Sequence, residues 1–175
     1  HTVSPARKRA RILLVDDHPL VRERLAEVIN REPDLVVCGE AEDRHEAIAA
    51  LNARQPDLAI VDLTLKQSDG IELIKDIRSR WPKVTCLVVS MHDESLFAER
   101  ALRAGARGYI MKQETLTSII TAIRCILGGK IYLSEKLKDA VLTQFASGSR
   151  TGDKSPIDSL SDRELEVYRL IGDGF

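Results

Sequence analysis

Short apolar segments alternate with helical patterns between residues 11 and 128 of this chain. The apolar segments are rich in Val, Ile and Leu and do not alternate with polar residues, which is typical of strands buried on both faces of a sheet. The predicted strands are Ile12–Val15, Leu35–Cys38, Leu58–Val61, Cys86–Val89 and Tyr109–Met111.

Each of these segments is followed by apolar residues three and four positions apart, the spacing of one face of a helix. The five helical sets are Val21, Leu25, Val28 and Ile29; Ala47, Ile48 and Leu51; Ile71, Ile74, Ile77 and Trp81; Phe97, Ala98, Ala101 and Leu102; and Leu116, Ile119, Ile120, Ile123 and Leu127. Successive strand–helix units predict an α/β fold, a doubly wound five-stranded parallel sheet with helices on both faces. Ligands of such sheets bind beyond the carboxyl ends of the strands.

The pattern changes after the fifth helical set. Apolar residues recur every four positions over Leu133–Phe145 and predict a helix that begins near Ser134, and a polar, turn-forming linker follows over residues 147–156. Ser161 and Glu164 have the spacing of a capping box and predict the first helix of a second, all-α domain whose remainder is absent. The expected organisation is a flexible basic N-terminus (1–10), the sheet domain (11–130), a helical linker and loop (131–159) and the start of the second domain (160–175).

Composition narrows the class of protein. The chain has 175 residues, 43% of them hydrophobic, which is enough to bury a core. Its 26 Lys and Arg against 27 Asp and Glu give a net charge of −1, which argues against a surface that binds nucleic acid over its whole extent. The longest unbroken apolar run, Ala47–Leu51, is too short to span a membrane, and we expect no membrane partner. Cys38, Cys86 and Cys125 are scattered in apolar stretches and predict buried free thiols in a reducing compartment, the cytoplasm.

Acidic residues end two of the predicted strands. Asp16 and Asp17 follow the first strand and Asp62 follows the third, and these strands flank the point where the strand order would reverse. Three carboxylates converging there would repel one another and favour a hard divalent cation such as Mg²⁺. The alternative is that Asp17, just before His18-Pro19, only complements the dipole of the first helix.

Two further strands end in groups that bind phosphoryl oxygens. Ser90 ends the fourth strand with a hydroxyl group, and Lys112 ends the fifth with an ammonium group. Together with the aspartates, they provide the parts for transferring a phosphoryl group to a carboxylate. In contrast, His18, His45 and His92 fall on separate segments, and we interpret them as solvent-facing or capping residues.

The motifs at these strand ends resemble those of receiver domains in bacterial two-component response regulators. The matching motifs are Val-Asp-Asp-His-Pro (15–19), Asp-Leu-Thr-Leu (62–65) with Asp-Gly (69–70), Val-Ser-Met-His-Asp (89–93) and Gly-Tyr-Ile-Met-Lys (108–112). The receiver domain has a flavodoxin-like fold, and the most similar subgroup is the NarL/FixJ type. Residues 160–174 are similar to the opening of the LuxR-type helix-turn-helix domain of that subgroup.

The resemblance implies roles for the site residues. Asp62 would be the phosphoacceptor. Asp17 would bind Mg²⁺ directly, Asp16 chiefly through water, and the main-chain carbonyl of Thr64 would be a further ligand. Lys112 would hold the phosphoryl group.

The resemblance also implies a switch and partners. Ser90 and Tyr109 would be the switch pair, the hydroxyl moving to the phosphoryl group and the ring following it. The phosphoryl group would come from a sensor histidine kinase, and the protein would form a homodimer and catalyse only its own phosphorylation and dephosphorylation. We expect promoter DNA to bind the full-length protein but not this stretch, which has four basic and six acidic residues from Ser147 onward and stops before a recognition helix.

Two departures from the family pattern and two alternatives remain. Many members have proline where Lys66 and Gln113 stand here, and a cis bond before Gln113 would cost roughly 3–4 kcal/mol, so that bond is either trans or strained. A phosphatase of the haloacid-dehalogenase type would need Asp-x-Asp-x-Thr after the first strand, where this chain has Asp-Asp-His. A receiver-like interaction module that is never phosphorylated would usually lack the site Asp or Lys, and both are present.

Overall fold

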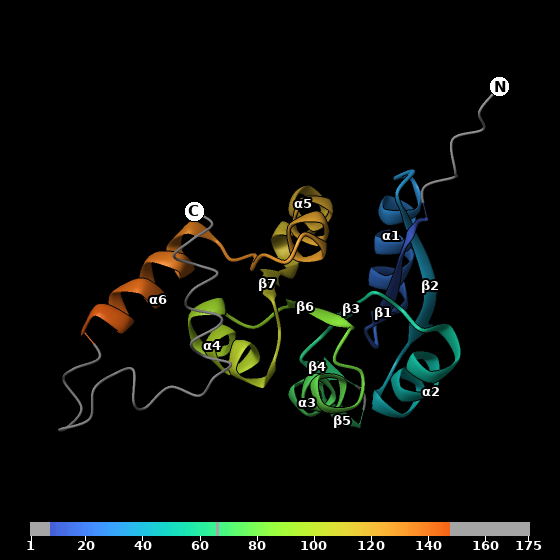
Figure 1. Cartoon of the computed structure of the whole chain (residues 1–175), viewed down its shortest axis with the longest axis horizontal. Coiled ribbons are helices and arrows are strands. Elements are labelled where there is room, and N and C mark those ends of the chain that lie inside the picture. The colour runs from blue at the N-terminus through green and yellow to red at the C-terminus, as the bar shows by residue number, and fades with distance from the viewer. Residues whose placement is uncertain (1–7, 66, 148–175) are drawn as a thin grey trace.

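A five-stranded parallel sheet forms the centre of the domain (Figure 1). The computed structural model describes residues 8–65 and 67–147. The strands are β1 (Ala10–Val15), β2 (Leu35–Ala41), β3 (Leu58–Val61), β6 (Thr85–Ser90) and β7 (Gly108–Met111). Their order is β2-β1-β3-β6-β7, and every neighbouring pair is parallel. The predicted doubly wound sheet is confirmed, and its strand order reverses between β1 and β3.

Helices cover both faces of the sheet. One face carries α1 (Pro19–Asn30) and α5 (Thr115–Leu127), and the other carries α2 (Arg44–Arg54), α3 (Gly70–Arg80) and α4 (Glu94–Ala104) (Figure 1). Successive strand residues therefore enter different cores: Leu14 packs under α1 and α5, and Val15 packs under the other three helices. This burial on both faces explains the continuous apolar runs of the sequence.

The apolar face predicted for α5 is buried only along its middle. Ile119 and Ile123 are fully buried, but Leu116 in the first turn is 52% exposed and Leu127 in the last turn is 37% exposed. The two ends of the helix thus present apolar side chains to solvent. A pattern of apolar spacing alone does not show where a helix extends beyond the sheet that it covers.

Aspartates cap three of the helices. Asp43, Asp69 and Asp93 each accept a 2.8 Å hydrogen bond from a backbone N–H in the first turn of α2, α3 and α4. The cap of α1 is His18, whose side chain makes no capping hydrogen bond. Asp17 Oδ1 also accepts no hydrogen bond from the described residues, but the alternative that Asp17 complements the dipole of α1 needs no such bond and stays a prediction.

Three short elements next to the site are absent from the sequence prediction. β4 (Thr64–Leu65) and β5 (Ser68–Asp69) form an antiparallel pair, and Gln67, directly before β5, has φ +56°. A 3-10 helix, η1 (Lys112–Glu114), follows β7. No cis peptide bond occurs in the described parts of the chain, so the bond before Gln113 is trans. Lys66, the other departure from the family pattern, lies outside the described residues.

The predicted helix after the sheet domain is α6 (Glu135–Ser147). It begins where expected, because the Ser134 hydroxyl accepts a 3.1 Å hydrogen bond from the N–H of Leu137. Of the three free cysteines, Cys86 is buried as predicted, whereas Cys38 and Cys125 are only half-buried. The predicted basic N-terminus falls mostly, and the helix of the second domain entirely, outside the described residues.

The search for membrane-spanning helices in the described residues found none of sufficient length and apolar character.

A close approach of two backbones explains the Asp-Gly pair at the start of α3. A Cβ atom on Gly70 would lie 2.2 Å from the carbonyl oxygen of Asp62 and 2.7 Å from the Cα of Leu63. Only glycine lets α3 begin this close to the segment that follows β3. The helix thereby supports the backbone that carries Asp62.

Substituting Gly70 should therefore disturb the protein more than an ordinary glycine substitution does. We expect Gly70→Ala to lower the free energy of unfolding by about 1–3 kcal/mol or more, because backbone atoms must move to admit the methyl group. Gly39→Ala is the matched control, since the nearest atom to its Cβ lies at 3.4 Å, an ordinary contact. Urea unfolding of both variants measures the difference, and equal stability of the two would contradict the proposed crowding.

Candidate functional site

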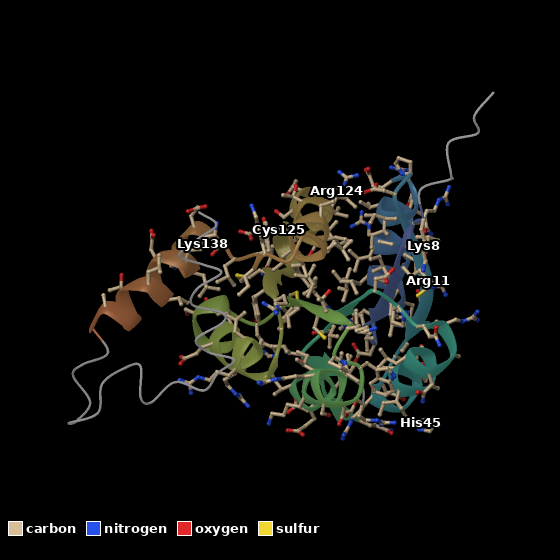
Figure 2. All side chains as sticks on the ribbon, in the orientation of Figure 1. Lys8, Arg11, His45, Arg124, Cys125 and Lys138 are labelled. Carbon is tan, nitrogen blue, oxygen red and sulfur yellow. The ribbon has the colours of Figure 1, made fainter. Side chains whose placement is uncertain are left out.

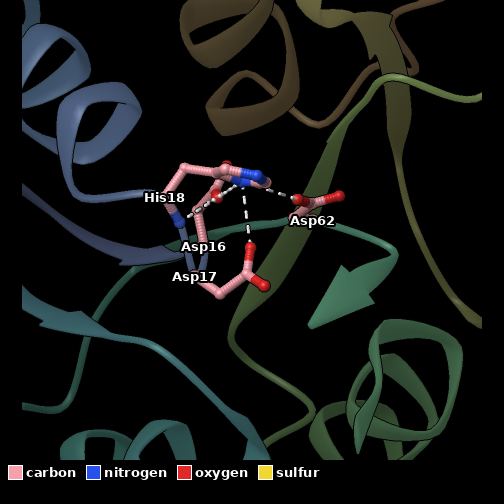
Figure 3. Close-up of side chains that lie close together, drawn as sticks. All are labelled: Asp16, Asp17, His18 and Asp62. Carbon is pink, nitrogen blue, oxygen red and sulfur yellow. Dashed lines mark hydrogen bonds and ion pairs between the residues drawn. The ribbon is translucent and has the colours of Figure 1, made fainter. Parts of the chain in front are cut away.

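Acidic side chains converge at the carboxyl ends of β1 and β3. Asp16 and Asp17 follow β1, and Asp62 follows β3, as the sequence predicted (Figure 3). One ligand atom from each, and one from His18, all lie within 4.8 Å of one another. Asp16 and Asp62 are only 4% and 3% exposed, so their negative charges are held close together with little water to screen them.

Lys112 supplies the positive charge that offsets these carboxylates. Its Nζ atom lies 3.0 Å from Asp16 Oδ2 and 2.9 Å from Asp62 Oδ2, and thus joins the ends of β1, β3 and β7. Burial by itself would lower the pKa of Lys112, but its hydrogen bonds to Asp62 and Asp16 outweigh burial and raise that pKa. The lysine is therefore charged at neutral pH.

Asp62 is less acidic than an ordinary aspartate. Burial raises the pKa of its carboxyl group, and the negative charge of Asp16 acts in the same direction. Hydrogen bonds from Lys112 and from the N–H of Thr64, at 3.2 Å from Oδ1, oppose this rise without cancelling it. Hydrogen bonds thus fix the Asp62 carboxylate in a place where its negative charge is disfavoured. Ionisable groups with pKa values shifted in this way are common at functional sites.

One oxygen atom of Asp17 has no hydrogen bond to the part of the chain that the structure describes. Asp17 Oδ1 is buried and accepts none from these residues, although His18 Nδ1 lies 2.9 Å away. That nitrogen is in hydrogen-bond geometry with Asp16 Oδ1 instead, also at 2.9 Å. A buried carboxylate oxygen without a donor suits a cation, and a set of carboxylate oxygens is what Mg²⁺ prefers. The residues present therefore fit this metal.

The sequence predicts a solvent-facing or capping role for His18. Its side chain is 58% exposed and it does occupy the cap position of α1, but its ring also contacts the carboxylates. It lies 3.3 Å from Lys112 Nζ and 4.0 Å from Asp62 Oδ2. Its position directly after the Asp pair was the only sequence signal for this contact.

The two residues of the predicted switch are linked through His92. Ser90 is fully buried and its Oγ accepts a 3.1 Å hydrogen bond from the N–H of His92. Tyr109 is 1% exposed, and its hydroxyl donates a 2.9 Å hydrogen bond to the His92 carbonyl. The imidazole of His92 also lies 2.6 Å from Thr64 Oγ1 and 4.5 Å from the Phe97 ring. The sequence did not predict this role of His92, because a histidine in a loop has no pattern that reveals its contacts.

Comparison with known proteins agrees with this geometry. Residues 12–124 match the family described as the response regulator receiver domain. The chain is 28% identical to the transcriptional regulatory protein DegU of Brevibacillus brevis, over 95% of this chain and 76% of that protein. It is 31% identical to the DNA-binding transcriptional activator DevR/DosR of Mycobacterium tuberculosis, over 94% of this chain and 75% of that protein. A solved two-component response regulator of the LuxR family from an Aurantimonas species is 37% identical, with a TM-score of 0.73 over 79% of this chain and 99% of that one.

The match to the receiver family decides against the phosphatase alternative. Receiver domains use Mg²⁺ at an acidic pocket, and in this chain Asp16, Asp17, His18 and Asp62 form an acidic cluster at the carboxyl ends of β1 and β3. The fold, the pocket and the relatives lead to one conclusion. The chain belongs to the response regulator receiver family, within the NarL/FixJ subgroup of two-component transcriptional response regulators.

Proposed function

We propose that Asp62 accepts a phosphoryl group from a sensor histidine kinase and that this modification controls a carboxyl-terminal DNA-binding domain. The observation that carries the proposal is the convergence of Asp16, Asp17 and Lys112 on the buried Asp62 carboxylate. Because the relatives are named as transcriptional regulators, promoter DNA is the proposed target of the full-length protein. The proposed location of the protein is the cytoplasm. The protein would catalyse only its own phosphorylation and dephosphorylation.

The transfer is a displacement at phosphorus. A carboxylate oxygen of Asp62 forms a bond to phosphorus while the bond between phosphorus and the histidine nitrogen of the kinase breaks. The electron pair of that bond stays with the imidazole, which takes a proton from solvent. The product is an aspartyl phosphate on this chain and a free histidine on the kinase.

The residues around Asp62 have distinct proposed roles. Asp16 and Asp17, with Asp62 itself and the Thr64 carbonyl, would hold Mg²⁺, which reduces the repulsion between the carboxylate and the phosphoryl oxygens. Lys112, already 2.9 Å from Asp62, would bind one phosphoryl oxygen. The ligand role of the Thr64 carbonyl stays a prediction, since only its N–H and hydroxyl contacts are observed.

Exposed apolar side chains at the same edge of the sheet support a protein as the phosphoryl donor. Leu20 is in the first turn of α1, Met91 directly follows β6, and Leu116 is in the first turn of α5. They are 74%, 62% and 52% exposed. All three residues lie in segments that follow the carboxyl ends of strands β1, β6 and β7, at the edge of the sheet where the acidic pocket lies. Apolar side chains beside a reactive carboxylate suit docking of a protein partner.

The phosphoacceptor is tested by labelling with acetyl phosphate. We expect wild-type protein to gain one phosphoryl group only in the presence of Mg²⁺, and Asp62→Asn to gain none, as measured by intact mass. Asp62→Asn should also be at least as stable as the wild type, because the raised pKa of Asp62 shows that its ionised form is disfavoured in the folded protein.

Asp69→Asn is the matched control for this experiment. Asp69 caps α3, and asparagine caps helices equally well, so this variant should fold and be labelled normally. Normal labelling of Asp62→Asn would disprove the assignment. Absence of labelling in every protein, with the metal bound, would instead favour an interaction module that is never phosphorylated.

The charge balance of the pocket is tested by Lys112→Met without metal. The variant leaves Asp16 and Asp62 buried without their cation, and we expect a loss of about 3–5 kcal/mol in the free energy of unfolding at pH 7. Loss of the hydrogen bond from Lys112 should raise the pKa of Asp62 further. When the pKa of an aspartate is higher in the folded state than its unfolded value of about 3.9, its ionisation destabilises the folded protein. This destabilisation grows from the unfolded pKa up to the folded pKa and is absent in acid below both, so the loss of stability in Lys112→Met should vanish there.

Added Mg²⁺ should restore more stability to Lys112→Met than it adds to the wild type, because it replaces the missing positive charge. Lys138→Met is the control: Lys138 is 12% exposed and pairs with Glu135 at 3.1 Å, away from the pocket. Thermal unfolding with and without Mg²⁺ measures both effects. An equal Mg²⁺ response in all three proteins would mean that the metal does not bind among these carboxylates.

The phosphoryl analogue beryllofluoride tests the link to assembly. With Mg²⁺ we expect it to shift the protein from monomer towards homodimer, because movement of Ser90 and Tyr109 changes the surface formed by α4, β7 and α5. Analytical ultracentrifugation measures the shift, and Asp62→Asn should show none. If fluorine NMR shows the analogue bound while neither the oligomeric state nor amide exchange near Tyr109 changes, the proposed switch fails.

A further inference from the structure

A pocket opens between α3 and α4, which lie side by side on one face of the sheet (Figure 1). Its volume is about 560 Å³, within the range of pockets that hold small organic molecules. Its lining includes Ile71, Lys75 and Arg78 of α3 and Arg100, Arg103 and Ala104 of α4. These residues lie on the two helices, so this α3–α4 pocket is separate from the acidic cluster at the strand ends.

The buried part of this lining is apolar and the exposed part is basic. Ile71 and Ala104 are 7% and 4% exposed and belong to the core under these helices, so they form an apolar floor. The charged side chains of the lining are all cationic, and all of them are exposed: Lys75, Arg78, Arg100 and Arg103. A cleft lined by charges of one sign attracts ligands of the opposite sign.

The helix dipoles account for only part of this basic set. Arg78 is in the last turn of α3 and Arg103 is in the last turn of α4, where a cation complements the dipole of its helix. Lys75 and Arg100 stand before those last turns, where this effect has faded. Their presence in the same pocket is therefore not explained by the stability of the helices.

The acidic residues beside the pocket neutralise it weakly. Lys75 Nζ lies 3.2 Å from Glu72 Oε1, and Arg103 Nη2 lies 2.8 Å from Glu99 Oε1. Each side chain in these two pairs is at least 49% exposed, and exposed ion pairs of this kind contribute little free energy. A ligand that carries a stronger negative charge can therefore replace the glutamates.

Arg100 has no partner in the described part of the chain, neither an ion pair nor a hydrogen bond. Arg124 of α5, labelled in Figure 2, shows the contrast, because its Nη2 atom lies 2.6 Å from Glu32 and 3.0 Å from Asp34. The guanidinium group of Arg100 thus keeps all its donors for a ligand.

Arg78 is held in place at the pocket. A Cβ atom on Gly105, which has φ +128°, would lie 3.0 Å from Arg78 Cδ, so the arginine side chain packs directly on this glycine. Arg78 Nη1 donates a 3.1 Å hydrogen bond to the carbonyl of Arg103. This one bond fixes the guanidinium group and leaves its other N–H groups available, so little side-chain entropy is lost on binding.

We propose that the α3–α4 pocket binds a nucleotide, a small molecule with phosphoryl groups on an aromatic base. Arg100 and Arg78 hold the phosphoryl oxygens, because the guanidinium group matches phosphate with two parallel hydrogen bonds. The base covers Ile71 and Ala104, which an inorganic anion would leave in contact with water. An acidic peptide is extended and fits a closed volume of this size less well. The site does not depend on phosphorylation of Asp62.

Isothermal titration calorimetry of the whole chain with ADP tests the proposal. The buffer contains EDTA, because a metal ion could otherwise bind ADP at the acidic cluster. We expect one ADP per chain, with an affinity that falls as salt is raised, and weaker binding of pyrophosphate and of adenosine. No binding of ADP would overturn the proposal. Pyrophosphate bound as tightly as ADP, or tetraglutamate bound more tightly, would overturn the nucleotide class.

Substitutions at Arg100 test the position of the site. We expect Arg100→Glu to weaken ADP binding by about tenfold or more, because hydrogen bonds to a charged group are lost. Arg24→Glu is the matched control: Arg24 is an exposed arginine of α1, on the other face of the sheet, and this change in charge should alter the affinity less than about twofold. Equal losses in both variants would mean that ADP responds only to net charge, and the proposal would be wrong.

Two further measurements do not depend on the charge reversal. Arg100→Lys keeps the positive charge but not the paired donors, and we expect a smaller loss of affinity than in Arg100→Glu. In the wild type, ADP should shift the amide NMR signals of Ile71 and Ala104 more than those of α1. Signals that move only outside α3 and α4 would place the ligand elsewhere and overturn the proposal.

Discussion

The burial of several carboxylates at one edge of the sheet is the constraint on which the domain depends. Asp16 and Asp62 are almost fully buried within 4.8 Å of each other, an arrangement that unpaired charges would make unstable. Lys112 meets both, and it comes from β7, which is separated from β3 by β6 in the sheet. Its long side chain crosses the end of β6 to reach them. The charge that lets the pocket form is thus available only once the whole sheet is assembled.

The same constraint explains how the backbone near the pocket is built. Gly70 lets α3 begin against the carbonyl of Asp62, and Asp69 caps that helix. The segment that follows β3 is therefore packed against the start of a capped helix. The Ser90 side is held differently. There the loop after β6 is held through His92: its imidazole lies 2.6 Å from Thr64 Oγ1, and its carbonyl accepts a hydrogen bond from the Tyr109 hydroxyl. The carboxylate side of the pocket is therefore supported by packed backbone, and the hydroxyl side by bonds that are easily exchanged.

Sequence patterns predicted the strands, the helices and the convergence of Asp16, Asp17, Asp62 and Lys112, because parallel strands of one sheet must end at one edge. The approach of Ser90 to this group stays a prediction. What they missed depends on contacts between segments far apart in the chain. The role of His92 arises from a loop packed against Thr64 and Tyr109, and the pairing of Tyr132 with β7 involves a single bridged residue, too short for a strand pattern. The exposed Leu116 and Leu127 show the same limit, since spacing gives the face of a helix but not how far it is covered.

Tyr109 shows why the site and the end of the sheet domain need not be treated as separate features. Tyr109 stands in β7, the last strand in the order of the five-stranded sheet, and its backbone N–H donates a hydrogen bond to the Tyr132 carbonyl. Its side chain meanwhile reaches the loop that carries Ser90. In an interior strand such as β3 both sides of the backbone are bonded within the sheet, and movement would break many hydrogen bonds at once. On the side of β7 that faces away from β6, the described residues form one bridge, between Gly108 and Tyr132, so a shift of Tyr109 would break fewer hydrogen bonds than a shift in β3. This is a physical reason for the proposed switch residue to stand in β7 rather than in β3.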